Sequence, residues 1–316
     1  MSKMSLIVLE LIKEGYSLNE IQKKLNLEPR EFSNILKNIR DYGYNFTRTL
    51  FSDGKILLKP NKTTEFPQRI NKTRLVVNDR ILKAIFISDL HIGSSFERPE
   101  LLKKVYEYAK SHDIHIIFNA GDVIDNVYTD SNQILKNPTV ESQIRKLIKV
   151  YPFDPDIINL NLYGNHDFKS LKEDGLDIAR LIEQKRYDLI SLNYGFNEIL
   201  LKDDSIAIIH DLKKSTKNKP NPNVSITFKG HSHKSKNSYK EDKKIFIPTL
   251  SDVTYGAYEY RPLVCFLEAE FIFIDKMIER INLRQLAIVK NEIRLANEEA
   301  IVLRKEPIEK RKAIKG

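Results

Sequence analysis

Short apolar segments alternate with polar ones over the first sixty residues, and the spacing of their apolar positions changes partway along. Helical spacing comes first, where Ser17 and Glu20 have the separation of a capping box at the start of a helix. Two later apolar runs flank Asp53 and Gly54, a dipeptide that favours a tight hairpin turn. The expected elements are helices over residues 4–14, 17–25 and 29–41 and strands over residues 46–51 and 55–58.

Three short helices followed by a hairpin resemble a winged helix-turn-helix domain over residues 1–60. On the third helix, Arg30, Asn34 and Lys37 are expected to face outward, where they could enter a DNA major groove. Residues 1–75 contain 14 Lys and Arg against 8 Asp and Glu, so this segment holds +6 of the net charge of +9. The same surface could instead dock a protein, form a dimer or simply be solvated.

A change of pattern after the hairpin divides the chain. Residues 59–73 are polar and contain two prolines, so we assign residues 61–76 to a linker. From residue 77 to residue 290, apolar strand patterns alternate with amphipathic helical patterns, which predicts an α/β domain. Residues 291–316 are assigned to a polar tail.

Five of the expected strands end directly in residues that bind metals or transfer protons. Alternate residues of an extended chain point to the same side, so Asp89 and His91, directly after the strand 85–87, are expected to share one direction. Ligand sites in sheets of this type lie at the carboxyl ends of strands. The residues expected there are Asp89, His91, Asp122, Asn165, His166, His210, His231 and His233. Such donors indicate a site for two divalent metal ions and a metal-assisted hydrolase.

The order of these motifs closely resembles the calcineurin-like metallophosphoesterases. They read Asp89-Leu90-His91, Gly121-Asp122, Gly164-Asn165-His166-Asp167, His210 and Gly230-His231-Ser232-His233. The resemblance implies a four-layer α/β/β/α sandwich that binds two divalent metal ions, with Mn expected and Fe or Zn as alternatives. It also implies a ligand set: Asp89, His91 and His233 for one metal, Asn165, His210 and His231 for the other, and Asp122 as the bridge.

The same resemblance implies a mechanism. Two metals activate a hydroxide that attacks phosphorus and stabilise the oxygen that leaves. His166 would contact the phosphate and act as a general acid, and Asp167 would orient His166. Loop capping is an equal alternative for Asp167 and for Asp125.

Differences between this chain and one branch of the superfamily indicate the class of substrate. Its protein serine/threonine phosphatases have an arginine after the second motif and read GNHE in the third, whereas this chain has Asn126 and GNHD. The strings SDLHIG and GNHD resemble the nuclease and phosphodiesterase branches instead. Residues 211–244 contain 10 Lys and 3 acidic residues, and Lys213, Lys214 and Lys217 could follow a phosphate backbone beside the active centre. The alternative is a solvated basic loop.

Taken together, the sequence predicts a metal-dependent phosphodiesterase that acts on nucleic acid, as a DNA nuclease, and two alternatives remain open. One alternative is an enzyme for a small nucleotide or phosphomonoester, with the N-terminal domain used for docking. The other is a DNA-binding regulator whose phosphoesterase domain senses a ligand, which the complete ligand set disfavours. The single cysteine, Cys265, and the absence of a signal or membrane-spanning pattern lead us to expect a cytoplasmic protein.

Overall fold

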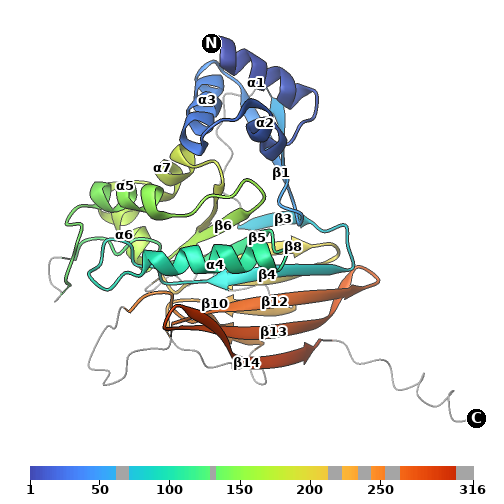
Figure 1. Cartoon of the computed structure of the whole chain (residues 1–316), viewed down its shortest axis with the longest axis vertical. Coiled ribbons are helices and arrows are strands. Elements are labelled where there is room, and N and C mark those ends of the chain that lie inside the picture. Colours follow the sequence, from blue (N-terminus) through green and yellow to red (C-terminus); the bar gives the residue numbers. More distant parts are fainter. Residues whose placement is uncertain (62–70, 129–132, 213–222, 234–242, 253–263, 304–316) are drawn as a thin grey trace, which may run out of the picture.

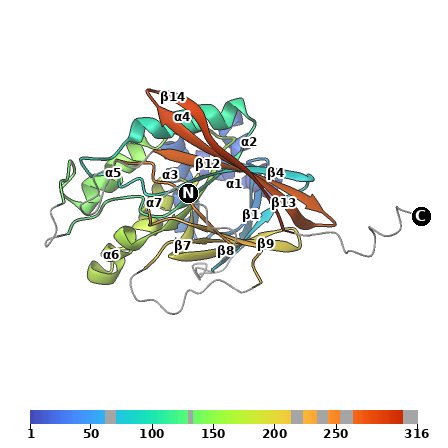
Figure 2. The same cartoon turned by 90° about the horizontal axis from the view of Figure 1, so that it is seen from below.

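Two seven-stranded sheets face each other in the computed structural model (Figures 1 and 2). The structure describes residues 1–61, 71–128, 133–212, 223–233, 243–252 and 264–303. The helices are α1 (Lys3–Lys13), α2 (Leu18–Leu25), α3 (Pro29–Asp41), α4 (Pro99–Ser111), α5 (Val140–Val150), α6 (Asn165–Asp174) and α7 (Ile178–Lys185). The strands are β1 (Asn45–Phe51), β2 (Ile56–Asn61), β3 (Lys72–Val76), β4 (Ile81–Ile87), β5 (Ile116–Ala120), β6 (Ile158–Tyr163), β7 (Leu189–Tyr194), β8 (Phe196–Leu201), β9 (Asp204–Ile209), β10 (Ile226–Lys229), β11 (Lys244–Phe246), β12 (Cys265–Ile274), β13 (Met277–Val289) and β14 (Glu292–Val302).

Sheet 1 has the strand order β14-β13-β12-β4-β5-β6-β7, and its strands β4 to β7 are parallel. Their alternating apolar residues face two different cores. Phe86 and Phe118 point to the core between the sheets, where the Phe86 ring stacks on Phe228 of sheet 2 at a centroid distance of 3.9 Å. Ile85 and Ile117 point to a second core beneath helices α4, α5 and α7. Strands β4 to β7 of sheet 1 are therefore buried on both faces, which explains their nearly continuous apolar runs.

Sheet 2 has the order β11-β10-β9-β8-β3-β1-β2. The predicted α/β class with two facing sheets is confirmed. Helices α4 to α7 form the layer outside sheet 1 (Figure 1). Among the described residues, no helix forms the second outer layer expected over β8 to β11. Strands β8 and β9 are joined directly by a tight turn at residues 202–203, so this connection has no room for a helix.

The N-terminal module, residues 1–61, contains the three helices and the hairpin that the sequence predicts. Ser17 and Glu20 form the expected capping box at the start of α2. Strand β1 also pairs in parallel with β3, so the hairpin extends sheet 2. Side chains of α1 and α3, such as Leu9 and Phe32, join the same apolar core as the residues between the two sheets. The module thus shares its core with the rest of the fold.

The module packs against the amino-terminal ends of strands β5, β6 and β7 (Figure 1). Lys23 forms an ion pair with Asp156, two residues before β6, at 2.7 Å. The rings of Phe32 and Tyr187, which lies two residues before β7, pack edge to face with their centroids 5.0 Å apart. The six residues of β6 separate the Lys23–Asp156 ion pair from the carboxyl end of the sheet, a length of roughly 20 Å.

Two segments differ from the sequence-based boundaries. Strand β3 lies within residues 61–76, which were predicted to be a linker, and pairs on both sides with β1 and β8. Strand β14 lies within residues 291–316, predicted to be a polar tail, and pairs with β13 along its whole length. Most β14 side chains are exposed, because it is an edge strand, so its sequence lacks the apolar alternation that marks a strand.

Candidate metal centre

The eight residues predicted at strand ends lie at the carboxyl edge of sheet 1 and the neighbouring edge of sheet 2. The loops after β4 and β5 are joined by backbone hydrogen bonds from Asp89 N to Gly121 O and from His91 N to Asp122 O. The expectation of an extended chain at Asp89 and His91 was wrong. Both residues have left-handed backbones, with φ of 57° and 45°, so a turn rather than strand alternation directs them.

Two glycines of the motifs make space for the ligands. A Cβ on Gly164 would lie 2.3 Å from Asp122 Oδ1 and 2.6 Å from His210 Nε2. A Cβ on Gly121, which has a φ of +113°, would lie 2.4 Å from His210 Nδ1. At Gly121 both the positive φ and the close approach require glycine, whereas at Gly164, whose backbone is extended, the close approach alone requires it.

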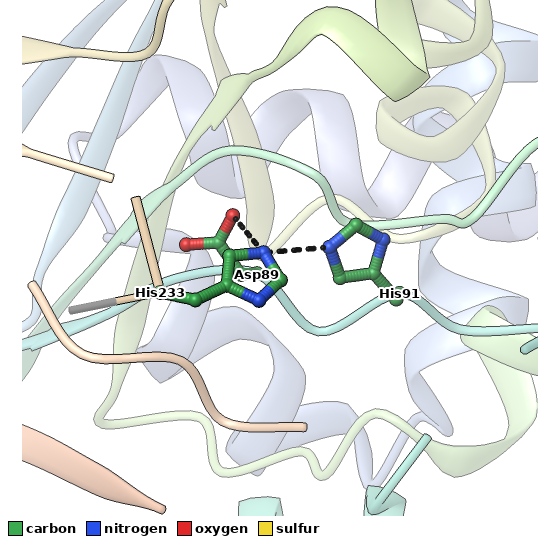
Figure 3. A group of neighbouring side chains, drawn as sticks. All are labelled: Asp89, His91 and His233. Atoms are coloured by element: carbon green, nitrogen blue, oxygen red, sulfur yellow. Dashed lines mark hydrogen bonds and ion pairs between the residues drawn. The ribbon is translucent and has the colours of Figure 1, made fainter. Parts of the chain in front are cut away.

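One group of possible ligands consists of Asp89, His91 and His233 (Figure 3). His233 Nε2 lies 3.4 Å from Asp89 Oδ1 and 3.4 Å from His91 Nε2. His91 Nδ1 donates to Asp125 Oδ1 at 2.9 Å, which leaves Nε2 directed at His233. Burial opposes the charge on Asp89, but the adjacent His233 imidazole lowers the pKa of Asp89 to about 2. The carboxylate is thus ready to bind a cation.

A second group consists of Asp122, His210 and His231, with Asn165 beside it. His210 Nε2 lies 3.0 Å from Asp122 Oδ2 and 3.1 Å from Asn165 Oδ1. Burial alone lowers the pKa of His210, but the Asp122 carboxylate raises it to about 9. Asp122 Oδ2 also lies 4.0 Å from His91 Nε2, so this oxygen lies between the two groups.

These donors fit divalent metal ions. The ligand atoms within each group lie within 4.8 Å of one another. Asp89 Oδ1 is buried and makes no hydrogen bond of acceptable geometry. His91 Nε2 and His233 Nε2 lie 3.4 Å apart, and a cation bound between them would be a ligand partner for both neutral rings. A mixed set of imidazole and carboxylate donors suits Mn, Fe or Zn.

His166 lies against the first group, with its ring centroid 4.7 Å from that of His91. Its Nδ1 donates to the carbonyl oxygen of Asp125 at 2.7 Å. The prediction that Asp167 orients His166 is wrong. The Asp167 carboxylate instead accepts backbone N–H groups of three residues, Val123, Ile124 and Gly164.

Asp167 therefore caps loops, the alternative that the sequence left open. Burial and the nearby Asp122 raise the pKa of Asp167 to about 7, while its three N–H donors favour the carboxylate. Asp125, for which loop capping was an expectation, supports His91 through its carboxylate and His166 through its carbonyl oxygen. Its spacing of three residues after Asp122 is the only sequence signal for this role.

The loop after Asp122 is held by residues that the sequence analysis did not single out as part of the site. Asn126, the residue that departs from the protein phosphatase pattern, donates from Nδ2 to His166 O and to Ser170 Oγ at 2.8 Å each. Gln143 Oε1 accepts the Asn126 N–H at 2.8 Å. These contacts tie the loop to helices α5 and α6, and none has a local sequence pattern.

The predicted nucleic-acid residues fall into two sets. Arg30, Asn34 and Lys37 are exposed on α3, as the helical spacing predicts, and lie in the module at the opposite end of the parallel strands. Lys213, Lys214 and Lys217 lie outside the described residues. No helix in the described ranges is long and apolar enough to cross a membrane.

Comparison with known proteins agrees with this geometry. A family model of the calcineurin-like phosphoesterase superfamily domain matches residues 82–249, more than half of the chain. The protein belongs to this superfamily, which implies a phosphoester hydrolase that uses divalent metals. A search among curated protein sequences returns no match.

Two crystal structures are similar in part. The calcineurin-like phosphoesterase YfkN from Bacillus subtilis has 9% sequence identity and a TM-score of 0.35, over 70% of this chain and 90% of that one. The nuclease MPE from Pseudomonas putida has 14% identity and a TM-score of 0.33, over 80% of this chain and 99% of that one.

Proposed function

We propose that the protein hydrolyses phosphodiester bonds in nucleic acid with the help of two divalent metal ions. The observation that carries the proposal is the position of Asp122, whose Oδ2 lies between the His210 and His91 ring nitrogens. Asp89, His91 and His233 would hold one ion, and Asn165, His210 and His231 the other, with Asp122 shared. When bound, the ions supply positive charge that polarises the phosphate and activates water.

The chain's own residues supply the remaining chemistry. The Asp125 carbonyl accepts the His166 Nδ1 proton and so fixes the orientation of the ring. In the imidazolium form, Nε2 carries the second proton, which passes to the leaving oxygen and leaves a neutral ring with its proton on Nδ1. The Asp122 carboxylate accepts the His166 backbone N–H at 2.9 Å, which fixes the start of α6 beside the ligands. This arrangement limits the reorganisation needed during the reaction.

Charge supports nucleic acid as the substrate. The chain carries a net charge of +9, and Arg30 and Lys37 are exposed on one face of α3. A polyanion is the partner that such an excess attracts most strongly.

The first test is degradation of labelled linear single- and double-stranded DNA with Mn²⁺. Asp122→Asn is expected to lower cleavage by more than about 100-fold, because it removes the charge shared by both ligand groups. Asp79→Asn, a change at an exposed aspartate, is the matched control and should cleave like the wild type. A wild type that leaves DNA and labelled RNA intact would refute nucleic acid as the substrate.

A small nucleotide is a second candidate substrate. The position of the N-terminal module favours it, because the module contacts the amino-terminal ends of β6 and β7 and contributes no residue to the metal centre. Turnover of bis-p-nitrophenyl phosphate by a protein that leaves DNA intact would support this candidate.

A further inference from the structure

Tyr128 lies beside the metal centre without belonging to any motif of the superfamily. Its ring meets His166 edge-on at a centroid distance of 4.9 Å. Lys169 Nζ lies 5.2 Å from the centroid of the same ring. The Tyr128 backbone N–H donates to Gln133 Oε1 at 2.9 Å, so the residue is also held through its main chain. Tyr128 is thus a half-buried, firmly placed neighbour of His166.

The hydroxyl of Tyr128 makes a hydrogen bond with the side chain of Asn165. The amide oxygen Oδ1 of Asn165 faces His210 Nε2 at 3.1 Å. An amide has an acceptor end and a donor end, so the NH₂ group is the end that remains for the phenol oxygen. Rotation of the amide by 180° would break both hydrogen bonds and turn the NH₂ group toward His210.

We propose that Tyr128 is a positioning residue that keeps the oxygen of Asn165 directed at the metal position and limits the motion of the His166 ring. The two tasks belong to different parts of one side chain. The hydroxyl acts on Asn165, and the ring acts on His166. The inference rests on the proposed function, because it assigns Asn165 to a metal.

Titration of the metal-free protein with Mn²⁺ by calorimetry tests the role of the hydroxyl. Tyr128→Phe is expected to weaken Mn²⁺ binding about 10- to 100-fold, the usual effect of losing a group that orients a ligand. Tyr108→Phe is the matched control, because Tyr108 donates its hydroxyl to Glu268 at 2.6 Å, and neither residue is among the possible ligands. This control should bind Mn²⁺ like the wild type.

Hydrolysis of bis-p-nitrophenyl phosphate separates the two tasks. Excess Mn²⁺ should restore the kcat of Tyr128→Phe, which keeps the ring, but should leave the kcat of Tyr128→Ala low. Unchanged Mn²⁺ affinity in Tyr128→Phe would overturn the inference. Tight Mn²⁺ binding by a wild type that cleaves no phosphodiester would refute the proposed function, and the titration would still judge the role of Tyr128.

Discussion

Single residues at the metal centre adopt left-handed backbone conformations, which residues with a Cβ rarely use. Positive φ angles occur at five of the possible ligands, Asp89, His91, Asp122, His231 and His233. For residues with a Cβ such conformations cost about 1 kcal/mol or more each, and the surrounding structure must hold them. The hydrogen bonds between the loops after β4 and β5 provide part of this support. The fold thus holds the donors close together before any ion binds.

Asp167→Asn tests the capping role found at this scale. We expect a loss of about 1–3 kcal/mol in the free energy of unfolding, because the amide NH₂ would face backbone N–H donors. The kcat at saturating Mn²⁺ should stay within a few-fold of the wild type, since Asp125 holds His166. Urea denaturation and turnover of bis-p-nitrophenyl phosphate measure the two quantities. Unchanged stability with a kcat lowered by about 10²-fold or more would restore the orienting role predicted from sequence.

The sequence predicts which residues gather at this edge, because carboxyl ends of parallel strands meet there. It does not predict the partner of His166. Asp167 is adjacent in sequence, but its carboxylate turns toward Val123 and Ile124. Asp125 reaches His166 across 41 positions of the chain, a contact that depends on the complete fold.

Secondary-structure elements with strong local signals match the prediction closely. Helix α2 begins after Ser17, as the capping box indicates, and the hairpin turns at Asp53 and Gly54. Elements without local signals were missed. Strand β14 is exposed along most of its length, and only its pairing with β13 defines it as a strand.

The capping box predicts a pH effect on stability. Hydrogen bonds from the Ser17 backbone and hydroxyl lower the pKa of Glu20, so the folded state favours the carboxylate. This contribution is present above the unfolded pKa and is lost as the pH falls through the folded pKa. Glu20→Gln should therefore reduce stability by about 0.3–1 kcal/mol near pH 7, and by less below pH about 4.

Thermal unfolding of Glu20→Gln and wild type at both pH values measures this difference. Glu14→Gln is the control, because Glu14 is an exposed acid at the end of α1 rather than at the start of a helix. A stability difference that stays constant with pH would contradict the assigned role of the Glu20 charge.

At the scale of the whole molecule, the N-terminal module and the two sheets form one structural unit. Strands β1 and β2 complete sheet 2, and α1 and α3 contribute to the core that lies between the sheets. Tyr187 adds a buried contact, since its backbone N–H donates to Ser33 Oγ at 3.1 Å. A tethered and independent N-terminal domain would show none of these features.

We therefore expect the protein to unfold in a single cooperative transition. Differential scanning calorimetry of the metal-free protein, with calorimetric and van't Hoff enthalpies compared, checks this expectation. A chain that lacks residues 1–61 should fail to fold, because its removal exposes apolar residues such as Leu75. Two separate transitions, or a stable truncated protein, would contradict it.

This shared core couples the surface of α3 to the distant catalytic edge by mass action. A polyanion that binds Arg30 and Lys37 in the folded state alone would raise the melting temperature of the entire protein, including the metal centre. A shift in the melting curve with uncleavable DNA would then report occupancy at α3 without any turnover. Charge-reversal variants at Arg30 and Lys37, rather than truncations, are the means to separate attachment from catalysis.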